Sequence, residues 1–88
     1  MKDILWVEAD DYYCKIQTSG KQYLISQTLK KFYDHLILLP MWMRIHRSYI
    51  VNLEHIEEIG DAFVVINGTK IPLNRLSKDE IMKKFVRV

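Results

Sequence analysis

The dipeptide Asn67-Gly68 restricts the possible folds of this chain more than any other feature. It separates two segments rich in β-forming residues, 63–66 and 70–73. Asn and Gly both tolerate positive φ, which a two-residue type I′ turn requires at its central positions, and this turn is the tightest link between antiparallel strands. The chain is therefore expected to contain at least one antiparallel hairpin.

Five more segments carry strand patterns. They are residues 4–9, 12–18, 21–25, 44–46 and 49–51. The second and third surround Ser19-Gly20, which predicts another hairpin. Asp10-Asp11 is expected to be a turn or strand break. The ambiguous stretch 53–59 is expected to turn at Leu53-Glu54 and then to form a strand.

Two segments show helical spacing instead. The first has apolar or aromatic residues three and four positions apart, an N-cap at Ser26 or Thr28, and an end near Pro40; the spaced residues are Leu29, Phe32, Tyr33 and Leu36. In the second, Ser77 and Glu80 have the spacing of a capping box, and the expected buried residues are Ile81, Met82 and Phe85. The predicted fold class is mostly β (β-rich α+β), with short antiparallel strands, one internal helix and one C-terminal helix. No helix-turn-helix can be drawn, so loops would have to read any bound DNA.

The size and composition fit one small folded domain. The chain has 88 residues, of which 49% are hydrophobic and 27% charged. No apolar run approaches the ~20 residues of a membrane helix, so no membrane association is expected. The chain starts directly with a strand pattern rather than a secretory leader, and Cys14 is its one cysteine. A cytoplasmic protein is expected.

The charges are distributed unevenly, although the net charge is only +2. Residues 26–48 and 69–88 are mainly basic, and residues 54–61 are mainly acidic. A molecule with one basic and one acidic side would orient itself on a polyanion such as DNA. An evenly mixed solvated surface is the alternative.

The most informative local motif for function is the run from Met43 to Asn52. It places Arg44, His46, Arg47 and Ser48 in five positions, directly before the apolar strand pattern. Buried unpaired charges are costly, so a core strand would not tolerate this pattern. A loop at a strand edge that presents Arg and Ser outward explains it. Arg in a rigid frame suits phosphate oxygens and the guanine edge in the major groove.

Other kinds of chemistry fail on spacing. The paired acidic residues are adjacent, so they point apart on a strand, and the histidines lack metal-ligand spacing. These residues are Asp10-Asp11, Glu57-Glu58, Asp79-Glu80, His35, His46 and His55. No glycine-rich phosphate loop is present. We expect no enzyme activity, no metal and no cofactor.

Several stretches together resemble the LytTR DNA-binding domain, the output module of a class of bacterial response regulators. They are Asp-Ile-Leu-Trp-Val-Glu-Ala at 3–9 with Asp11-Tyr12, Tyr23-Leu24 with Thr28-Leu29-Lys30, Arg-Ile-His-Arg-Ser-Tyr-Ile-Val-Asn at 44–52 with Ile56, and 65–68 through 71–75. The run 44–52 is the specific one. The resemblance covers nearly the whole chain, so residues 1–88 are expected to be one such domain.

The resemblance implies an elongated fold whose loops enter successive major grooves of double-stranded DNA, as part of a two-component transcription regulator. By alignment, the DNA-binding positions would be Asp11, Tyr12, Tyr13, Arg44, Arg47, Ser48, Asn74 and Arg75. Lys30 and Lys78 are added as phosphate contacts on charge alone. The family usually has further strand residues before Asp3-Ile4, a receiver domain upstream, and often Ser in place of Asn74.

Alternatives remain for single residues and for the function. Arg47 is expected to contact a base edge; the alternative is that it is a surface residue paired with Glu54 or Glu57. His46 is expected to be structural and hydrogen-bonded to backbone. Arg44 and Arg75 are expected at phosphates, and one of Tyr12 and Tyr13 in the core. The domain is expected to be a monomer in solution and to bind direct repeats in a promoter. The alternative function is a small protein-interaction module whose basic rim binds an acidic partner.

Overall fold

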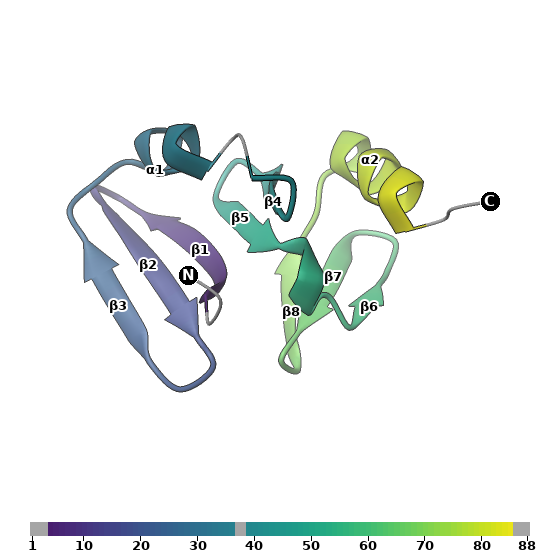
Figure 1. The fold of residues 1–88 in the computed structure, drawn as a ribbon, viewed down its shortest axis with the longest axis horizontal. Coiled ribbons are helices and arrows are strands. Elements are labelled where there is room, and N and C mark those ends of the chain that lie inside the picture. Colours follow the sequence, from purple (N-terminus) through teal and green to yellow (C-terminus); the bar gives the residue numbers. More distant parts are fainter. Residues whose placement is uncertain (1–3, 37–38, 86–88) are drawn as a thin grey trace.

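The computed structural model describes residues 4–36 and 39–85, which form a mostly β body of 40 × 25 × 22 Å (Figure 1). Its elements in chain order are β1 (Ile4–Asp10), β2 (Tyr13–Thr18), β3 (Gln22–Ile25), α1 (Leu29–Leu36), β4 (Trp42–His46), β5 (Tyr49–Asn52), the 3₁₀ helix η1 (Leu53–His55), β6 (Glu58–Ile59), β7 (Phe63–Ile66), β8 (Thr69–Pro72) and α2 (Arg75–Phe85). The expected class, short antiparallel strands with two helices, is confirmed.

The strands form two antiparallel sheets. The larger has the order β3-β2-β1-β5-β4 and the smaller has the order β6-β7-β8. Both predicted hairpins are present: Gln17 pairs with Gln22 around Ser19-Gly20, and Ile66 pairs with Thr69 around Asn67-Gly68. Asn67 and Gly68 have φ values of 52° and 77°, as the type I′ turn requires.

The larger sheet separates two cores because successive residues of a strand point to opposite faces. The α1 core lies between α1 and this sheet. It contains Val7, Cys14, Leu29, Leu36, Trp42 and Ile50. The inter-sheet core lies on the other face, where the smaller sheet and α2 pack. It contains Leu5, Trp6, Met43, Ile45, Val51, Leu53, Val64, Ile66, Ile71, Leu73 and Ile81.

Polar side chains define where two of the shorter elements begin. Thr28, one of the two predicted caps, accepts a hydrogen bond from the Lys31 amide at 3.2 Å and so caps α1. The buried Asn52 accepts from the Glu54 amide at 3.0 Å and starts η1. The ambiguous stretch after it turns and then forms β6, as expected.

The start of α2 differs from the prediction. The Ser77 amide donates to Asn74 Oδ1 at 2.8 Å, so Asn74 is the N-cap and Ser77 lies inside the helix. The capping box at Ser77 and Glu80 is therefore wrong. Asn and Ser are equally good caps, so local preference could not choose between the two starts.

The buried side of α2 follows from this earlier start. Ser77 and Ile81, one helical turn apart, are buried as one stripe. Met82 is 40% exposed, so its predicted burial is wrong, and the side chain of Phe85 lies outside the described part of the chain. Neither of the described helices is long and apolar enough to cross a membrane.

Candidate nucleic-acid interface

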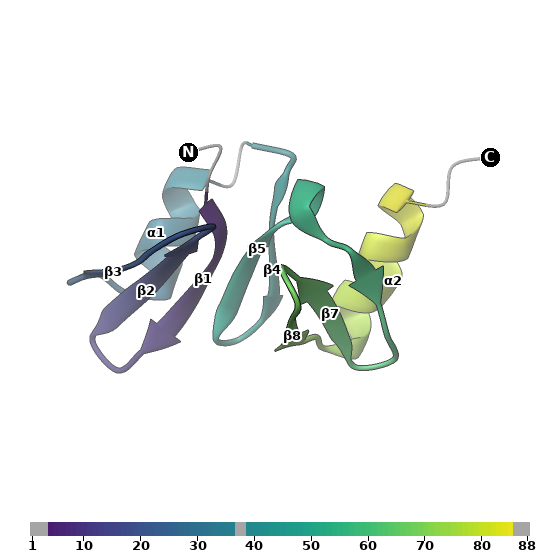
Figure 2. The same ribbon diagram turned by 90° about the horizontal axis from the view of Figure 1, so that it is seen from below.

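The strands run across the long axis of the molecule, so their turns follow its long edges (Figure 2). The β1–β2 turn and the β4–β5 turn lie at the same edge because β1 and β5 are antiparallel neighbours, with Glu8 opposite Tyr49. The Ala9 amide donates to the Ser48 carbonyl at 2.8 Å, which joins the two turns directly.

Two more segments lie at this edge. The Asn74 amide donates to the Ile45 carbonyl at 2.9 Å, which attaches the start of α2 to the end of β4. The Leu73 amide donates to the Ala62 carbonyl at 3.0 Å, which attaches the β6–β7 turn. We call residues 11–13, 47–48, 60–62 and 74–75 the turn edge. They follow the lower border of the molecule in Figure 2.

Seven of the ten predicted DNA-binding residues lie on the turn edge itself. They are Asp11, Tyr12, Tyr13, Arg47, Ser48, Asn74 and Arg75. Lys30 is exposed in the first turn of α1, which starts beside the turn edge because Ile25, at the end of β3, pairs with Cys14. Arg75 opens α2, so the positive end of a helix dipole also faces this border.

The β4–β5 turn is held by side chains as well as by backbone. Arg44 is half-buried, and its guanidinium donates to the Arg47 carbonyl at 2.8 Å. His46 Nδ1 accepts from the Ser48 amide at 3.1 Å, which confirms that His46 is structural and bonded to backbone. Arg44 therefore positions the turn that carries Arg47.

Arg47 is exposed to solvent. Among residues 4–36 and 39–85 the ion pairs are Lys15–Asp10 and Lys78–Asp61, so Arg47 does not pair with Glu54 or Glu57. A rigid turn that carries an exposed guanidinium is the geometry that bidentate recognition of phosphate or guanine needs.

The β1–β2 turn exposes two aromatic residues. Asp10 pairs with Tyr13, so the turn is Asp11-Tyr12, one residue later than predicted, and Asp11 has a φ of 54°. Tyr12 is 83% exposed and Tyr13 49% exposed, so the prediction that one of them lies in the core is wrong. Tyr12 is exposed because it lies in the turn. Tyr13 faces out because strand residues alternate and its neighbour Cys14 faces the α1 core.

The α2 end of the turn edge carries an acidic residue that sequence reasoning missed. Asp61 Oδ1 lies 3.1 Å from Lys78 Nζ, and its carboxylate is fully exposed. Asp61, Ala62, Leu73, Arg75, Lys78 and Asp79 line an open hollow of about 520 Å³. The acidic segment 54–61 was expected on the side opposite the basic residues, but the β6–β7 turn returns Asp61 to the turn edge. No local pattern signals this, since it follows from strand pairing.

Two titratable groups are shifted by their surroundings. Burial, and then the charge of Glu8 and a hydrogen bond to it, raises the pKa of the Tyr49 hydroxyl. Burial raises the pKa of the Cys14 thiol, which donates to the Gln27 carbonyl at 3.0 Å. Within the described residues no group of three or more His, Cys, Asp or Glu side chains could hold a metal ion.

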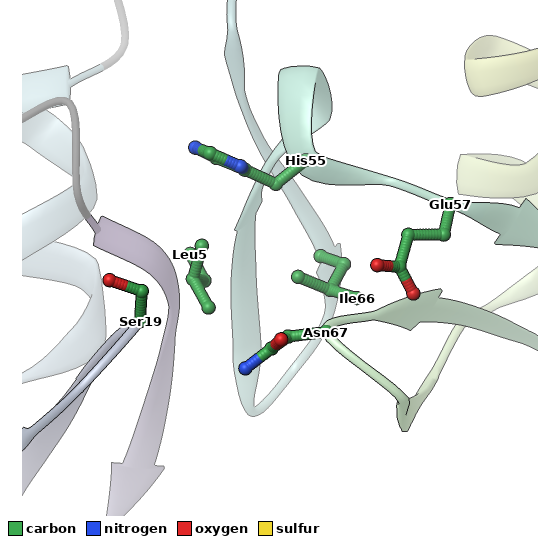
Figure 3. A pocket seen from close by; sticks show the side chains of 6 residues that line it. All are labelled: Leu5, Ser19, His55, Glu57, Ile66 and Asn67. Carbon is green, nitrogen blue, oxygen red and sulfur yellow. The ribbon is translucent and has the colours of Figure 1, made fainter.

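A second cleft opens away from the turn edge, between the two sheets (Figure 3). It has a volume of about 180 Å³ and is lined by Leu5, Ser19, His55, Glu57, Ile66 and Asn67. Its polar groups partly serve the fold, since Glu57 Oε1 accepts from the Gly68 amide at 3.2 Å. The predicted site residues lie elsewhere.

The geometry fits a class of proteins that contact nucleic acid through loops: a strand-rich body presents Arg, Lys, Tyr and a helix N-terminus along one edge. A model of the LytTr DNA-binding domain matches residues 1–86, and the chain belongs to that family.

Known relatives carry regulatory names. The chain is 33% identical to the sensory transduction protein LytT of Bacillus subtilis, over 93% of this chain and 36% of that protein. It is 35% identical to the sensory transduction protein LytR of Streptococcus agalactiae, over 85% of this chain and 32% of that protein. With the transcriptional regulatory protein LytR of Staphylococcus aureus it shares 32% identity, over 80% of this chain and 29% of that protein. The chain thus spans about a third of the length of these relatives.

A solved LytTr DNA-binding domain from Bacillus cereus has the same fold. It superposes with a TM-score of 0.78 at 23% identity, and the match covers 98% of this chain and 84% of that one.

Proposed function

We propose that this chain binds double-stranded DNA sequence-specifically through the turn edge, as the output domain of a cytoplasmic bacterial transcription regulator. The observation that carries the proposal is the row of predicted contact residues along one border of a body 40 Å long. That length is comparable with the roughly 34–36 Å between successive major grooves on one side of a duplex. Membership of the LytTr DNA-binding domain family supports it independently.

The contacts divide by their geometry. Arg47 is suited to a base edge, because its turn is rigid and its guanidinium is exposed. Arg75 and Lys30, near helix N-termini, are suited to phosphates. Ser48, Asn74, Asp11, Tyr12 and Tyr13 offer polar groups for sugar, phosphate and base edges. No step of this recognition needs a metal or a cofactor.

The wider assembly is part of the proposal. The domain acts as a monomer in solution, and copies occupy two direct-repeat half-sites of a promoter. In the intact protein a receiver domain would link the copies and raise their occupancy through effective concentration. A protein-interaction module with a basic rim is the rival function, and family membership does not favour it.

The test begins with selection of bound sequences from random duplex DNA. Arg47→Ala should weaken binding to the selected site by about 1–3 kcal/mol and binding to scrambled DNA much less. Lys21→Ala is the matched control: it also removes one positive charge, but from the β2–β3 turn, at the end of β2 away from the turn edge. An equal loss on both DNAs would show that Arg47 touches only phosphate.

Salt dependence gives a second readout. If Lys30, Arg44, Arg47 and Arg75 meet phosphates, the log–log slope of affinity against salt should be roughly −4. A slope near zero would refute DNA binding and leave the acidic-partner module as the better explanation. Selection without an enriched sequence would refute the sequence specificity.

A further inference from the structure

The turn edge contains a carboxylate where a phosphate-binding surface would be expected to have none. Asp61 lies in the β6–β7 turn, beside the start of α2, and its carboxylate is fully exposed. It pairs with Lys78 at 3.1 Å, and both line the hollow that also contains Arg75. A phosphate that enters this hollow meets the negative charge of Asp61 within the Debye length of roughly 8–10 Å.

The ion pair has little value for the fold. An exposed pair gains little Coulomb energy in water and is screened by salt. The β6–β7 turn is already attached by the backbone bonds from Gly60 to Phe63 and from Leu73 to Ala62. The start of α2 has its own cap in Asn74. Asp61 is therefore free to serve binding rather than folding.

Resting on the proposed function, we propose that Asp61 is a specificity-determining residue that withholds Lys78 from DNA phosphates. Non-specific binding comes almost entirely from phosphate contacts, so it depends on how many cations are available. At the target site the base contacts fix the register of the duplex, so a free Lys78 gains a phosphate only if that register brings one within reach. On scrambled DNA the duplex can shift until a phosphate meets Lys78. Occupying Lys78 therefore weakens non-specific binding more than specific binding.

The proposal predicts that removal of the negative charge of Asp61 strengthens DNA binding. Asp61→Asn should strengthen binding to scrambled DNA roughly two- to fivefold, the range expected for one exposed charge pair. It should make the salt slope steeper by about 0.9, the value for one more phosphate contact. Binding to the selected site should rise less, so the ratio of specific to non-specific affinity should fall.

A double-mutant cycle tests the role of Lys78. In a Lys78→Met background, Asp61→Asn should change the salt slope and the affinity for scrambled DNA much less than it does with Lys78 present, because no paired cation is left to release. An undiminished gain in that background would overturn the proposal and assign the effect to direct repulsion of phosphate. Circular dichroism and thermal melting should show that all variants remain folded.

Glu54→Gln provides the matched control for net charge. Glu54 is an exposed acidic residue in η1. Asn52, which caps η1, donates to the carbonyl of Ile4, the first residue of β1, so η1 lies away from the turn edge, where β1 ends. This variant should leave both affinities unchanged, and a gain equal to that of Asp61→Asn would overturn the proposal. If the wild type binds DNA with the expected salt slope but Asp61→Asn behaves identically, the inference alone fails. Absence of binding by the wild type would instead refute the proposed function.

Discussion

The two ends of the turn edge are held in different ways. At the α2 end, the Ser77 hydroxyl donates to the Arg44 carbonyl at 3.4 Å and joins α2 to β4, and the Arg44 guanidinium donates to the Arg47 carbonyl at 2.8 Å within the β4–β5 turn. At the other end, the Asp11-Tyr12 turn depends on strand pairing and on a positive φ at Asp11. One end is braced through its side chains and the other mainly through its backbone.

The difference matches the chemistry that each end presents. Bidentate recognition by Arg requires a fixed direction for the guanidinium, which a braced turn supplies. A tyrosine hydroxyl that meets sugar or phosphate tolerates more variation in position. We therefore expect the α2 end to determine sequence preference and the Asp11-Tyr12 end to add affinity without preference.

The largest expected effect comes from the cores that support the two ends. Ile45→Ala and Ile50→Ala each remove a fully buried side chain and should each cost about 2–5 kcal/mol of unfolding free energy, measured by urea denaturation. Ile45 lies in the inter-sheet core and Ile50 in the α1 core. Hydrogen exchange should show faster opening of α2 in the first variant and of α1 in the second. Identical patterns would mean that the two ends are one cooperative unit.

Loss of the α2 cap should have the next largest effect. Asn74→Ala removes the acceptor for the Ser77 amide and should lower the unfolding free energy by about 1 kcal/mol. It should also weaken binding to the selected site, because the start of α2, which positions Arg75, is no longer held by its cap. Asn74→Ser is the control, since Ser also caps and should retain most of the stability. Equal destabilisation by both would show that Asn74 stabilises the protein through something other than its cap.

A smaller effect is expected at the other end. Tyr12→Ala should weaken DNA binding by less than about 1 kcal/mol, the value of one net hydrogen bond, and equally on selected and scrambled DNA. Its 83% exposure means that folding stability should not change. Fluorescence anisotropy with both DNAs measures this. A loss confined to the selected site would contradict the contrast between the two ends.

The smallest effect concerns pH. The pKa of Tyr49 is raised above its ordinary value of 10.0 by burial and by Glu8, so the folded state favours the neutral phenol. Above the unfolded pKa the unfolded state releases its proton first, so stability should fall as pH rises through the folded pKa. Tyr49→Phe should make this decline shallower. The decline in stability that remains in this variant includes the contribution of Cys14, whose pKa is also raised by burial. An unchanged decline would show that Tyr49 does not contribute.

Local patterns predicted most of the elements. The turns at Ser19-Gly20 and Asn67-Gly68 and the helix at Leu29–Leu36 depend on short-range preferences, so they are readable from the chain. The start of α2 was missed because Asn74 and Ser77 are equally plausible caps, and tertiary contact decides between them. Ser77 is buried against β4, where it bonds to Arg44.

The candidate site was predictable only in part. Family resemblance indicated which residues would belong together, and strand pairing then places seven of them on one edge. The pairing of Asp61 with Lys78 depends on how a second sheet packs beside the first, which no spacing in the sequence encodes. The exposure of Tyr13 follows from the register of β2, in which Cys14 faces the core, and Tyr12 is exposed because it lies in the turn.

Backbone hydrogen bonds from Ala9 to Ser48 and from Asn74 to Ile45 fix the distances between the turns of the turn edge. Because these turns cannot move independently, the two segments of a duplex that they contact must also lie at a fixed separation. One inserted base pair moves those segments apart by about 3.4 Å and rotates them by about 35°, more than a hydrogen bond tolerates. Target sites should therefore vary in the bases between the contacted segments far more freely than in the number of those bases.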